Sequence, residues 1–383
     1  MMWFFSVGAT PLKPRHMNVA ISPSAVAKTH ADPEVIVFNL KKRFSGVSAT
    51  VNALVPLQLS QWKLGYCGNT LANGVLGMSL RQAIRISKAP PAGRAFRIWH
   101  VRRDPEMMAG IWARDVLRLP IRLVFTSAAQ HLHGRFPRWL ISKMDAVIAT
   151  TPLAARFVPN TVAVIPHGIE LSRFAAPPDK LHAWSESGLP GRYGVGVFGR
   201  IRPTKGTDVF VDAMIQALPQ LPDVTAVIVG LAKPKEQAYQ TALVEKIAAA
   251  GLSERIVFLG FVPEGQELEW YKRCLVCVAC PRYEPFGLTP FEAAAAGCAL
   301  VCSRTGAFDQ LALPGLTGEM VDTGDAEGLA GAFVELMRDP ENVAQMGAAA
   351  RQRVTEHFSL EREAQAIGQV YTQLFTGHRP DAA

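Results

Sequence analysis

The chain has 383 residues, of which 49% are hydrophobic and 19% are charged, a balance typical of a globular protein large enough for two domains. No stretch approaches the roughly 20 apolar residues of a membrane-spanning helix, which argues against an integral helical membrane protein. The formal charge of +8 is uneven, because residues 1–190 carry 23 Lys and Arg against 9 Asp and Glu, whereas residues 191–383 carry 17 against 23. The basic first half predicts anionic partners such as nucleic acid, acidic lipid headgroups or phosphorylated substrates, with a solvated arginine-rich surface as the alternative.

Residues 1–34 hold no sustained apolar segment and no clean small-residue cleavage site, so we expect a disordered leader rather than a signal peptide. The six cysteines lack the even spacing of a secreted disulfide scaffold, which favours reduced thiols in the cytoplasm. Cys274, Cys277 and Cys280 form a CxxCxxC run, but Glu284 stands where a fourth cluster ligand would be. We therefore expect a buried strand here and no metal site.

From residue 35 onward, short apolar runs alternate with helical patterns. Strands are expected at 35–40, 63–68, 96–101, 121–126, 145–150 and 162–168. Helix-like stretches between them include 107–118 and 136–143, and a glycine-containing loop is expected at 43–51. This alternation is typical of parallel βαβ units.

The pattern restarts after a break that contains Pro and Gly near 188–194. Strands are expected at 193–200, 224–230, 255–261, 274–280 and 298–304, and helices at 207–217, 236–250, 289–296, 326–338, 341–355 and 360–376. The chain is thus predicted to be an α/β protein of two Rossmann-like, doubly wound parallel-sheet domains that face each other across a cleft.

The loop "GRIRPTKG" at 199–206 follows the first strand of the second half. Gly199 permits a tight turn, and Arg200 and Lys205 flank it in positions suited to an anion such as a diphosphate. The glycine spacing matches neither a Walker loop nor a dinucleotide fingerprint. A surface turn with two solvated cations would explain the same residues.

The stretch "RYEPFGLTPFE" at 282–292 places a Pro-Phe-Gly turn between a strand and a helix. Free N–H groups at the start of that helix would favour a phosphate, and Glu284 could accept hydrogen bonds from sugar hydroxyls. Thr289 and Glu292, however, have the spacing of a capping box, which explains Glu292 without any ligand.

The order of "FGRIRPTKG" (198–206), "RYEPFGLTPFE" (282–292) and "TGAF…GLTGEMV" (305–321) resembles the retaining glycosyltransferases of family 4, which have the GT-B fold. The resemblance covers most of 35–376. It implies an acceptor-binding domain at 35–188, a nucleotide-sugar-binding domain at 189–358, and a C-terminal helix and tail at 359–383 that pack back toward the first domain. It also implies that no cofactor or divalent metal is needed, since the nucleotide sugar is a co-substrate.

The resemblance assigns catalytic roles to Arg200, Lys205 and Glu284. The two cations would hold the donor diphosphate and stabilise it as it leaves, and Glu284 would face the donor sugar. Glu292 would bind ribose hydroxyls, and backbone amides of the turn would contact phosphate and sugar. The implied donor-binding set is Gly46, Gly199, Arg200, Lys205, Glu284, Phe286, Gly287, Leu288 and Glu292.

Within the first half, "FNLKKRFSGVSATV" (38–51) resembles the family's first glycine loop, with its paired glycines reduced to Gly46. A histidine found after the fourth strand in many relatives is replaced here, and His131 and His133 follow slightly later. The stretches at 35–51, 98–116 and 123–151 look most like bacterial lipopolysaccharide-core mannosyltransferases that act on a Kdo-containing inner core. The implied acceptor-binding residues are Lys41, Lys42, Arg43, His100, Arg102, Arg103, Ser127 and His131.

The expected activity is therefore metal-independent, retaining transfer of a sugar, foremost mannose from GDP-mannose, to an anionic lipid-linked saccharide. We expect a cytoplasmic enzyme, with peripheral contact to the inner membrane through the aromatic and basic stretch at 135–143. The alternatives are a transferase that uses a UDP-sugar, a GT-B sugar-nucleotide epimerase, and a basic nucleic-acid-binding module. A nicotinamide dehydrogenase lacks its glycine fingerprint, and no specific nucleic acid is expected.

Overall fold

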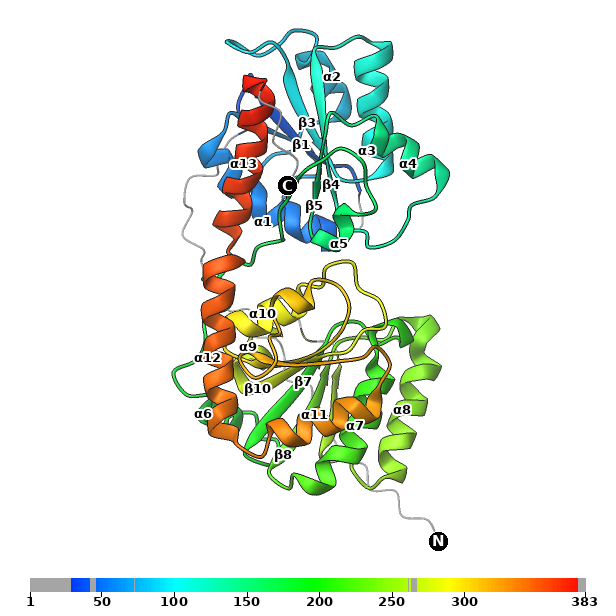
Figure 1. Cartoon of the computed structure of the whole chain (residues 1–383), viewed down its shortest axis with the longest axis vertical. Coiled ribbons are helices and arrows are strands. Elements are labelled where there is room, and N and C mark those ends of the chain that lie inside the picture. Colours follow the sequence, from blue (N-terminus) through cyan, green and yellow to red (C-terminus); the bar gives the residue numbers. More distant parts are fainter. Residues whose placement is uncertain (1–28, 42–45, 72, 261, 263–266, 378–383) are drawn as a thin grey trace.

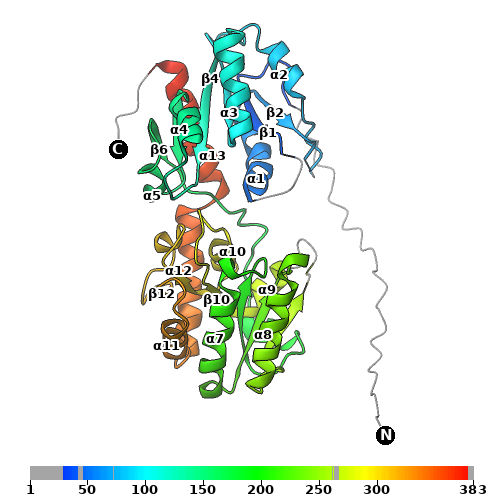
Figure 2. The same cartoon turned by 90° about the vertical axis from the view of Figure 1, so that its right-hand side faces the viewer.

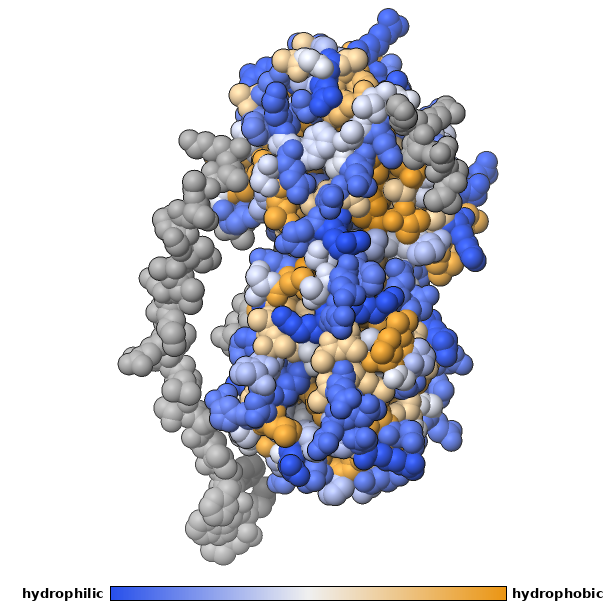
Figure 3. All heavy atoms as spheres, turned by 60° about the vertical axis from the view of Figure 1, so that its left-hand side comes forward, coloured by the Kyte–Doolittle hydropathy of each residue, from blue (hydrophilic) through white to orange (hydrophobic). Residues whose placement is uncertain are grey.

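The structure, a computed structural model, describes residues 29–41, 46–71, 73–260, 262 and 267–377. Two α/β lobes are stacked along the long axis of the molecule (Figure 1). Lys42, Arg43 and most of the predicted leader lie outside the described residues. The space-filling view in Figure 3 shows a face on which hydrophilic side chains predominate and hydrophobic ones form separate patches on both lobes.

The first lobe is built on one parallel sheet. Its strands are β1 (Val35–Asn39), β2 (Leu64–Gly68), β3 (Arg97–Val101), β4 (Ile121–Ser127), β5 (Ala146–Ala149) and β6 (Thr161–Val164). They are arranged in the order β2-β1-β3-β4-β5-β6. Successive residues of β1 enter two different buried clusters, with Val35 and Val37 on one face and Ile36 and Phe38 on the other. Both faces of the sheet are therefore covered, as expected for a doubly wound fold.

The helices of the first lobe are α1 (Gly46–Gln61), α2 (Leu80–Ile86), α3 (Asp104–Ile111), α4 (Arg135–Ser142) and α5 (Pro152–Ala155), with a π-helical turn at Trp112–Val116 after α3. The prediction of a loop over 43–51 was wrong for its described part, because α1 begins at Gly46. Two features hide this helix in the sequence: Pro56 lies inside it, and its buried face includes the polar residues Ser48, Thr50 and Gln58.

The second lobe repeats the architecture. Its strands are β7 (Tyr193–Phe198), β8 (Val224–Val229), β9 (Ile256–Gly260), β10 (Cys274–Ala279), β11 (Ala299–Ser303) and β12 (Gly318–Val321), in the parallel order β12-β11-β10-β7-β8-β9. Its helices are α6 (Lys180–Ser185), α7 (Thr207–Ala217), α8 (Gln237–Ala249), α9 (Glu267–Arg273), α10 (Thr289–Ala295), α11 (Ala326–Leu336) and α12 (Pro340–His357). The two parallel α/β sheets confirm the predicted fold class.

The chain passes between the lobes twice, and the two passages are hydrogen-bonded to each other. The N–H of Ile169 donates to the carbonyl of Phe358 at 2.8 Å, and the N–H of Leu360 donates to the carbonyl of Ile169 at 3.1 Å. A Cβ on Gly168 would lie 2.4 Å from the carbonyl oxygen of Ser359, so only glycine permits this approach. The first passage precedes the predicted boundary at 188, because Phe174 and Trp184 are buried in the core of the second lobe.

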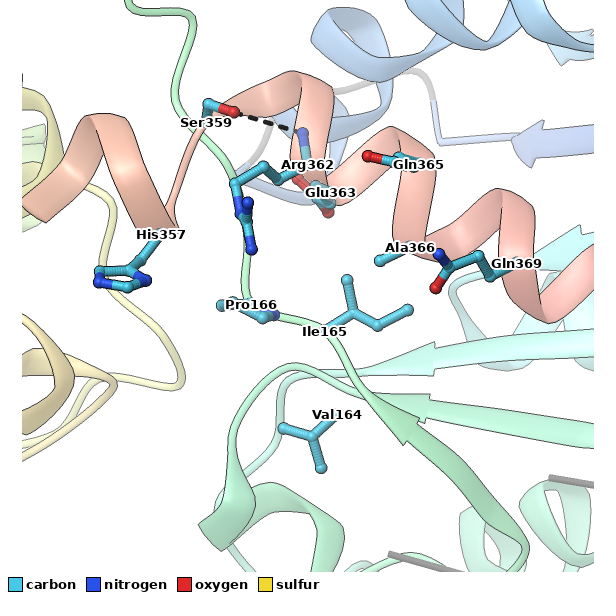
Figure 4. Close-up of a pocket in the computed structure, with 10 residues that line it drawn as sticks. All are labelled: Val164, Ile165, Pro166, His357, Ser359, Arg362, Glu363, Gln365, Ala366 and Gln369. Carbon is cyan, nitrogen blue, oxygen red and sulfur yellow. Dashed lines mark hydrogen bonds between the residues drawn. The ribbon is translucent and has the colours of Figure 1, made fainter. Parts of the chain in front are cut away.

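The last helix, α13 (Leu360–Thr376), returns to the first lobe. It continues the line of α12 past the junction and lies beside α1 (Figures 1 and 2). The Ser359 hydroxyl caps it by accepting from the N–H of Arg362 at 3.3 Å, next to a cavity of about 470 Å³ between α13 and the segment 164–166 (Figure 4). Ile367, Val370 and Tyr371 complete the first lobe's core.

Candidate active site

Two cavities lie where the lobes meet, at the carboxyl ends of both sheets. The first, called here the Glu292 cavity, has a volume of about 650 Å³ and joins Ala49 of α1 to Arg200, Tyr271 and Glu292 of the second lobe. The second, called the Arg102 cavity, has a volume of about 510 Å³ and joins Arg102, Ser127 and His131 of the first lobe to Tyr283 and Pro285 of the second. Helices α1 and α10 face each other at this junction (Figures 1 and 2).

Glu292 does not cap its helix. Helix α10 begins at Thr289, and the capping position is held by Leu288, whose side chain makes no capping hydrogen bond. The capping-box prediction was wrong because Thr289 is already helical and cannot turn its hydroxyl back to the N–H of Glu292. The Glu292 carboxylate instead accepts from the Tyr271 hydroxyl at 2.9 Å at the wall of the Glu292 cavity, and burial raises its pKa.

Arg200 and Gly199 line the same cavity from the end of β7. Gly199 has a φ of +125°, which favours glycine. A Cβ on Gly230 would lie 1.8 Å from the carbonyl oxygen of Gly199, so the loops after β7 and β8 can approach each other this closely only because Gly230 has no side chain. The Arg200 guanidinium is exposed and forms no ion pair within the described ranges. Its charge is therefore available to a ligand in the cavity.

Lys205 and Glu284, which are 79 positions apart in the chain, form an ion pair. The pair is held by a bridge between the two loops, in which the Arg282 guanidinium donates to both carboxylate oxygens of Asp208 at 2.8 and 2.7 Å. The Glu284 N–H donates to the Thr305 hydroxyl at 3.2 Å. The Lys205 side chain is still 27% exposed, so its ammonium, which has three N–H groups, can hold a second anion.

The turn after Glu284 offers backbone N–H groups, rather than side chains, to a possible ligand. The Phe286 ring is buried, and its carbonyl accepts from the N–H of Ala307 at 2.9 Å. Gly287 has a φ of +85°, and a Cβ there would lie 2.3 Å from the Phe308 ring. The N–H groups of Gly287 and Leu288 have no acceptor among the residues that the structure describes. Gly46 lines neither cavity, although its neighbours Val47 and Ala49 do.

Residues of the two lobes form hydrogen bonds with each other across the junction. The His131 Nδ1 lies 2.8 Å from the Tyr283 hydroxyl, and the Gln130 amide donates to the Gly306 carbonyl at 2.8 Å. The sequence prediction assigned no role to Gln130, which belongs to no recognisable motif, or to Tyr283, although Tyr283 lies within the stretch at 282–292. Only the packing of the lobes brings them together.

His100 does not reach the cleft. Its ring is fully buried, with Nδ1 2.5 Å from the Tyr371 hydroxyl and Nε2 2.7 Å from the Thr126 hydroxyl. Burial lowers its pKa well below the ordinary histidine value. The prediction that His100 contacts the acceptor is corrected: it lies behind Thr126, which does line the Arg102 cavity.

The basic residues predicted to bind the acceptor differ in their surroundings. Arg103 donates to Asn39 Oδ1 at 2.6 Å and to the Ser48 hydroxyl at 3.1 Å, so it braces the start of α1. Arg102 lines the cavity and is 7% exposed, whereas Lys41 is exposed at the end of β1 and outside the cavity. Across the described part of the chain, no group of three or more His, Cys, Asp or Glu could hold a metal ion.

Comparisons with known proteins agree with this architecture. A family model described as "Glycosyl transferases group 1" matches residues 186–353. The lipopolysaccharide core biosynthesis mannosyltransferase LpcC of Rhizobium leguminosarum bv. viciae is 42% identical over 349 residues, which are 91% of this chain and 98% of the relative. The mannosyltransferase LpsB of Rhizobium meliloti (strain 1021) is 42% identical over 90% of this chain and 98% of its own length.

Among solved structures, Anabaena Alr3699/HepE in complex with UDP and glucose superposes with a TM-score of 0.73 over 88% of this chain and 99% of its own. At 18% sequence identity, this likeness shows the two-lobed fold alone. The family match and the 42% identity along nine-tenths of the chain show the family as well as the fold. This chain belongs to the group 1 glycosyltransferases.

Proposed function

We propose that this glycosyltransferase moves mannose from GDP-mannose to a lipopolysaccharide-core acceptor, with retention of configuration and without a metal. The observation that carries the proposal is that the two motifs meet in space: Lys205 forms an ion pair with Glu284, and Arg200 and Glu292 line one cavity. The printed activities of the two relatives support the choice of sugar and acceptor.

The chemistry follows from the charge that develops as the donor bond breaks. Cleavage of the sugar–phosphate bond leaves negative charge on the diphosphate and partial positive charge on the sugar. Arg200, Lys205 and the free N–H groups of the turn at 286–288 are proposed to stabilise the leaving group. A leaving phosphate oxygen would take the acceptor proton, so Glu284 need not act as a nucleophile. Its carboxylate would orient Lys205 and accept from a hydroxyl of the sugar.

Glu292 is proposed to hold the ribose of the nucleotide. Its carboxylate lies at the cavity wall and, among the described side chains, accepts one hydrogen bond, from Tyr271, which leaves acceptor capacity for ribose hydroxyls.

The test is incubation with a panel of GDP- and UDP-sugars, with and without EDTA, and with a lipopolysaccharide-core acceptor. We expect GDP release and a glycosylated acceptor from GDP-mannose alone, at an unchanged rate in EDTA, with the α-anomeric configuration kept in the product. Selective use of a UDP-sugar would overturn the donor assignment. An altered nucleotide sugar formed without acceptor would indicate an epimerase.

We further propose that α4 contacts an anionic membrane surface. None of the described helices is long and apolar enough to cross a membrane. On α4, the exposed rings of Phe136 and Trp139 are stacked, and Arg135 and Arg138 line a nearby cavity together with Arg156. Aromatic rings beside cations that form no ion pair with any described residue suit a surface of acidic headgroups.

Flotation with vesicles of phosphatidylglycerol and phosphatidylcholine tests this contact. We expect binding that weakens with salt and is lost in Phe136→Ser combined with Trp139→Ser. Absence of binding at any salt concentration would end the proposal.

A further inference from the structure

Arg102 is a buried cation without a carboxylate partner. The side chain is 7% exposed, and its only hydrogen bond within the described residues is a long one, 3.5 Å, to the Thr50 hydroxyl. Its Nε is buried with no partner. Burial lowers the pKa of the guanidinium, the direction expected of a desolvated cation. A buried charge left unpaired costs several kcal/mol, so such a group is expected to have a ligand.

Two carboxylates whose charges act on the Arg102 guanidinium, Glu106 and Glu363, are held by other groups. Glu106 accepts from the N–H of Leu40 at 3.0 Å and from the backbone N–H of Arg102 at 2.8 Å, and it also pairs with Arg103. Glu363 accepts from His167 at 2.9 Å and from the N–H of Gly168 at 2.7 Å. Neither forms an ion pair with the Arg102 guanidinium.

The cavity wall beside Arg102 holds two more unsatisfied polar atoms. Ser127, at the end of the neighbouring strand β4, is 2% exposed, and its hydroxyl has no hydrogen-bond partner in the part of the chain that the structure describes. The Nε2 of His133 is likewise buried without a partner. All three residues line the same cavity of about 510 Å³. Three orphaned polar groups around one space indicate a ligand that supplies hydrogen-bond acceptors.

The charge of the site favours a monoanion. Arg102 contributes one positive charge, and Arg103, which also lines the cavity, is paired with Glu106. Asp104 brings a negative charge to the same wall, which disfavours a ligand with more than one negative charge, and Ser127 has no charge. Burial and the neighbouring His131 lower the pKa of His133 against the opposing effect of Asp104, which favours the neutral form of the ring. A carboxylate matches one guanidinium in charge and in its two-oxygen geometry. The donor diphosphate has its own cations, Arg200 and Lys205, on the second lobe.

We propose that Arg102 and Ser127 bind the carboxylate of an acidic sugar in the acceptor. This inference rests on the proposed function for the identity of the acceptor. The cavity also contains Tyr283 and Pro285, which flank Glu284, so the acidic sugar lies next to the position proposed for the transferred sugar. The site thereby selects acceptors that carry a carboxylate close to the hydroxyl that is glycosylated.

The test compares a Kdo-containing core acceptor with its carboxyl methyl ester in equilibrium binding without any donor. We expect esterification to weaken binding to the wild-type protein about 10- to 100-fold, the loss typical of hydrogen bonds to a charged group. Arg102→Gln should weaken binding of the acid by a similar factor and leave binding of the ester nearly unchanged. Ser127→Ala should act in the same direction with a smaller effect.

Arg81→Gln is the matched control, because Arg81 is an exposed cation of the same lobe, on α2 and outside both cavities. It should bind both acceptors as the wild type does. Circular dichroism and GDP binding verify that Arg102→Gln is folded. If that variant fails to fold, the comparison of acid and ester binding by the wild type and by Ser127→Ala tests whether the site binds a carboxylate.

Two results would overturn the inference. One is equal binding of acid and ester by the wild type. The other is strong competition by inorganic phosphate that is lost in Arg102→Gln, with no competition by acetate or by the free acidic sugar. That pattern would assign the site to a phosphate group. A failure of GDP-mannose turnover would overturn the proposed donor, but not this binding comparison, which uses no donor.

Discussion

At the scale of single residues, the candidate site depends on the pairing of charges. The ion pair places Lys205 against Glu284, while Arg200 has no such partner within the described ranges and faces the Glu292 cavity. The two cations thus differ before a donor binds: Lys205 is oriented by a carboxylate, whereas Arg200 is exposed at the cavity. Both are expected to act on the leaving diphosphate, where developing negative charge is greatest.

Removal of either cation should slow the reaction. We expect Arg200→Ala or Lys205→Ala to lower kcat at least ~10²-fold, the size attributed to loss of one charge-stabilising group. Lys233→Ala, which removes an exposed cation of the same lobe outside both cavities, serves as the control. Steady-state rates of GDP release measure the effect, and rates equal to the wild type would refute these roles.

Glu292 should make the stability of the protein depend on pH. Burial raises its pKa above 4.5, so between pH 4.5 and the raised value the folded state binds more protons than the unfolded state. The free energy of unfolding should therefore decrease as the pH rises through that interval. In Glu292→Gln this contribution is absent, so urea unfolding should show the variant gaining stability relative to the wild type from pH 4.5 upward. A difference that stays constant with pH would contradict the burial of an ionisable carboxyl.

At the scale of elements, glycines set the positions of the two loops of the candidate donor site. Gly206, with a φ of +70°, brings the loop of Lys205 against β10, where a Cβ would lie 1.9 Å from the Cys280 carbonyl. Gly287 likewise lets the turn before α10 pack closely against the Phe308 ring. These loops could be recognised from the sequence by their glycines and flanking charges. Helix α1 and strand β12 could not, because a proline and polar buried residues obscure the first and β12 is only four residues long.

Gly287→Ala should unfold more readily than a glycine variant made in open space. The new Cβ would meet the Phe308 ring at 2.3 Å in addition to adopting a positive φ. Gly251→Ala is the control, because Gly251 has a φ of +69° with nothing within 4 Å of an added Cβ. We expect a loss of about 1 kcal/mol in the control and clearly more in Gly287→Ala, together with loss of turnover. Equal urea midpoints for the two variants would show that the turn can relax.

At the scale of the whole molecule, the two passages between the lobes form a single joint. Glu363 of α13 binds both His167 and the backbone N–H of Gly168, and the His167 ring packs against Phe286 at 4.9 Å between centroids. The joint therefore connects the last helix to the turn that carries the candidate donor site. The lobes cannot change their angle without altering these contacts.

Glu363→Gln tests that joint, with Glu361→Gln as the control on the same helix. Glu363 is 3% exposed and receives two hydrogen bonds, so we expect a loss of about 1–3 kcal/mol in the free energy of unfolding. Glu361 is exposed and its substitution should change little. Thermal unfolding measures both variants, and matching melting temperatures would exclude a structural role for the joint.

The sequence alone was sufficient for the fold class, for most strands, and for the two motifs that hold the candidate donor residues. These features are local: apolar runs of strand length, glycines at loop ends, and charges a few positions away are visible in any window of the chain. Only the tertiary structure decided that the Glu292 carboxylate accepts from Tyr271 instead of capping α10, and that Lys205 pairs with Glu284. It also decided that Arg103 pairs with a carboxylate, whereas its neighbour Arg102 forms no ion pair with any described residue. Adjacent arginines are chemically identical in a sequence, and what distinguishes them is contact with residues far along the chain.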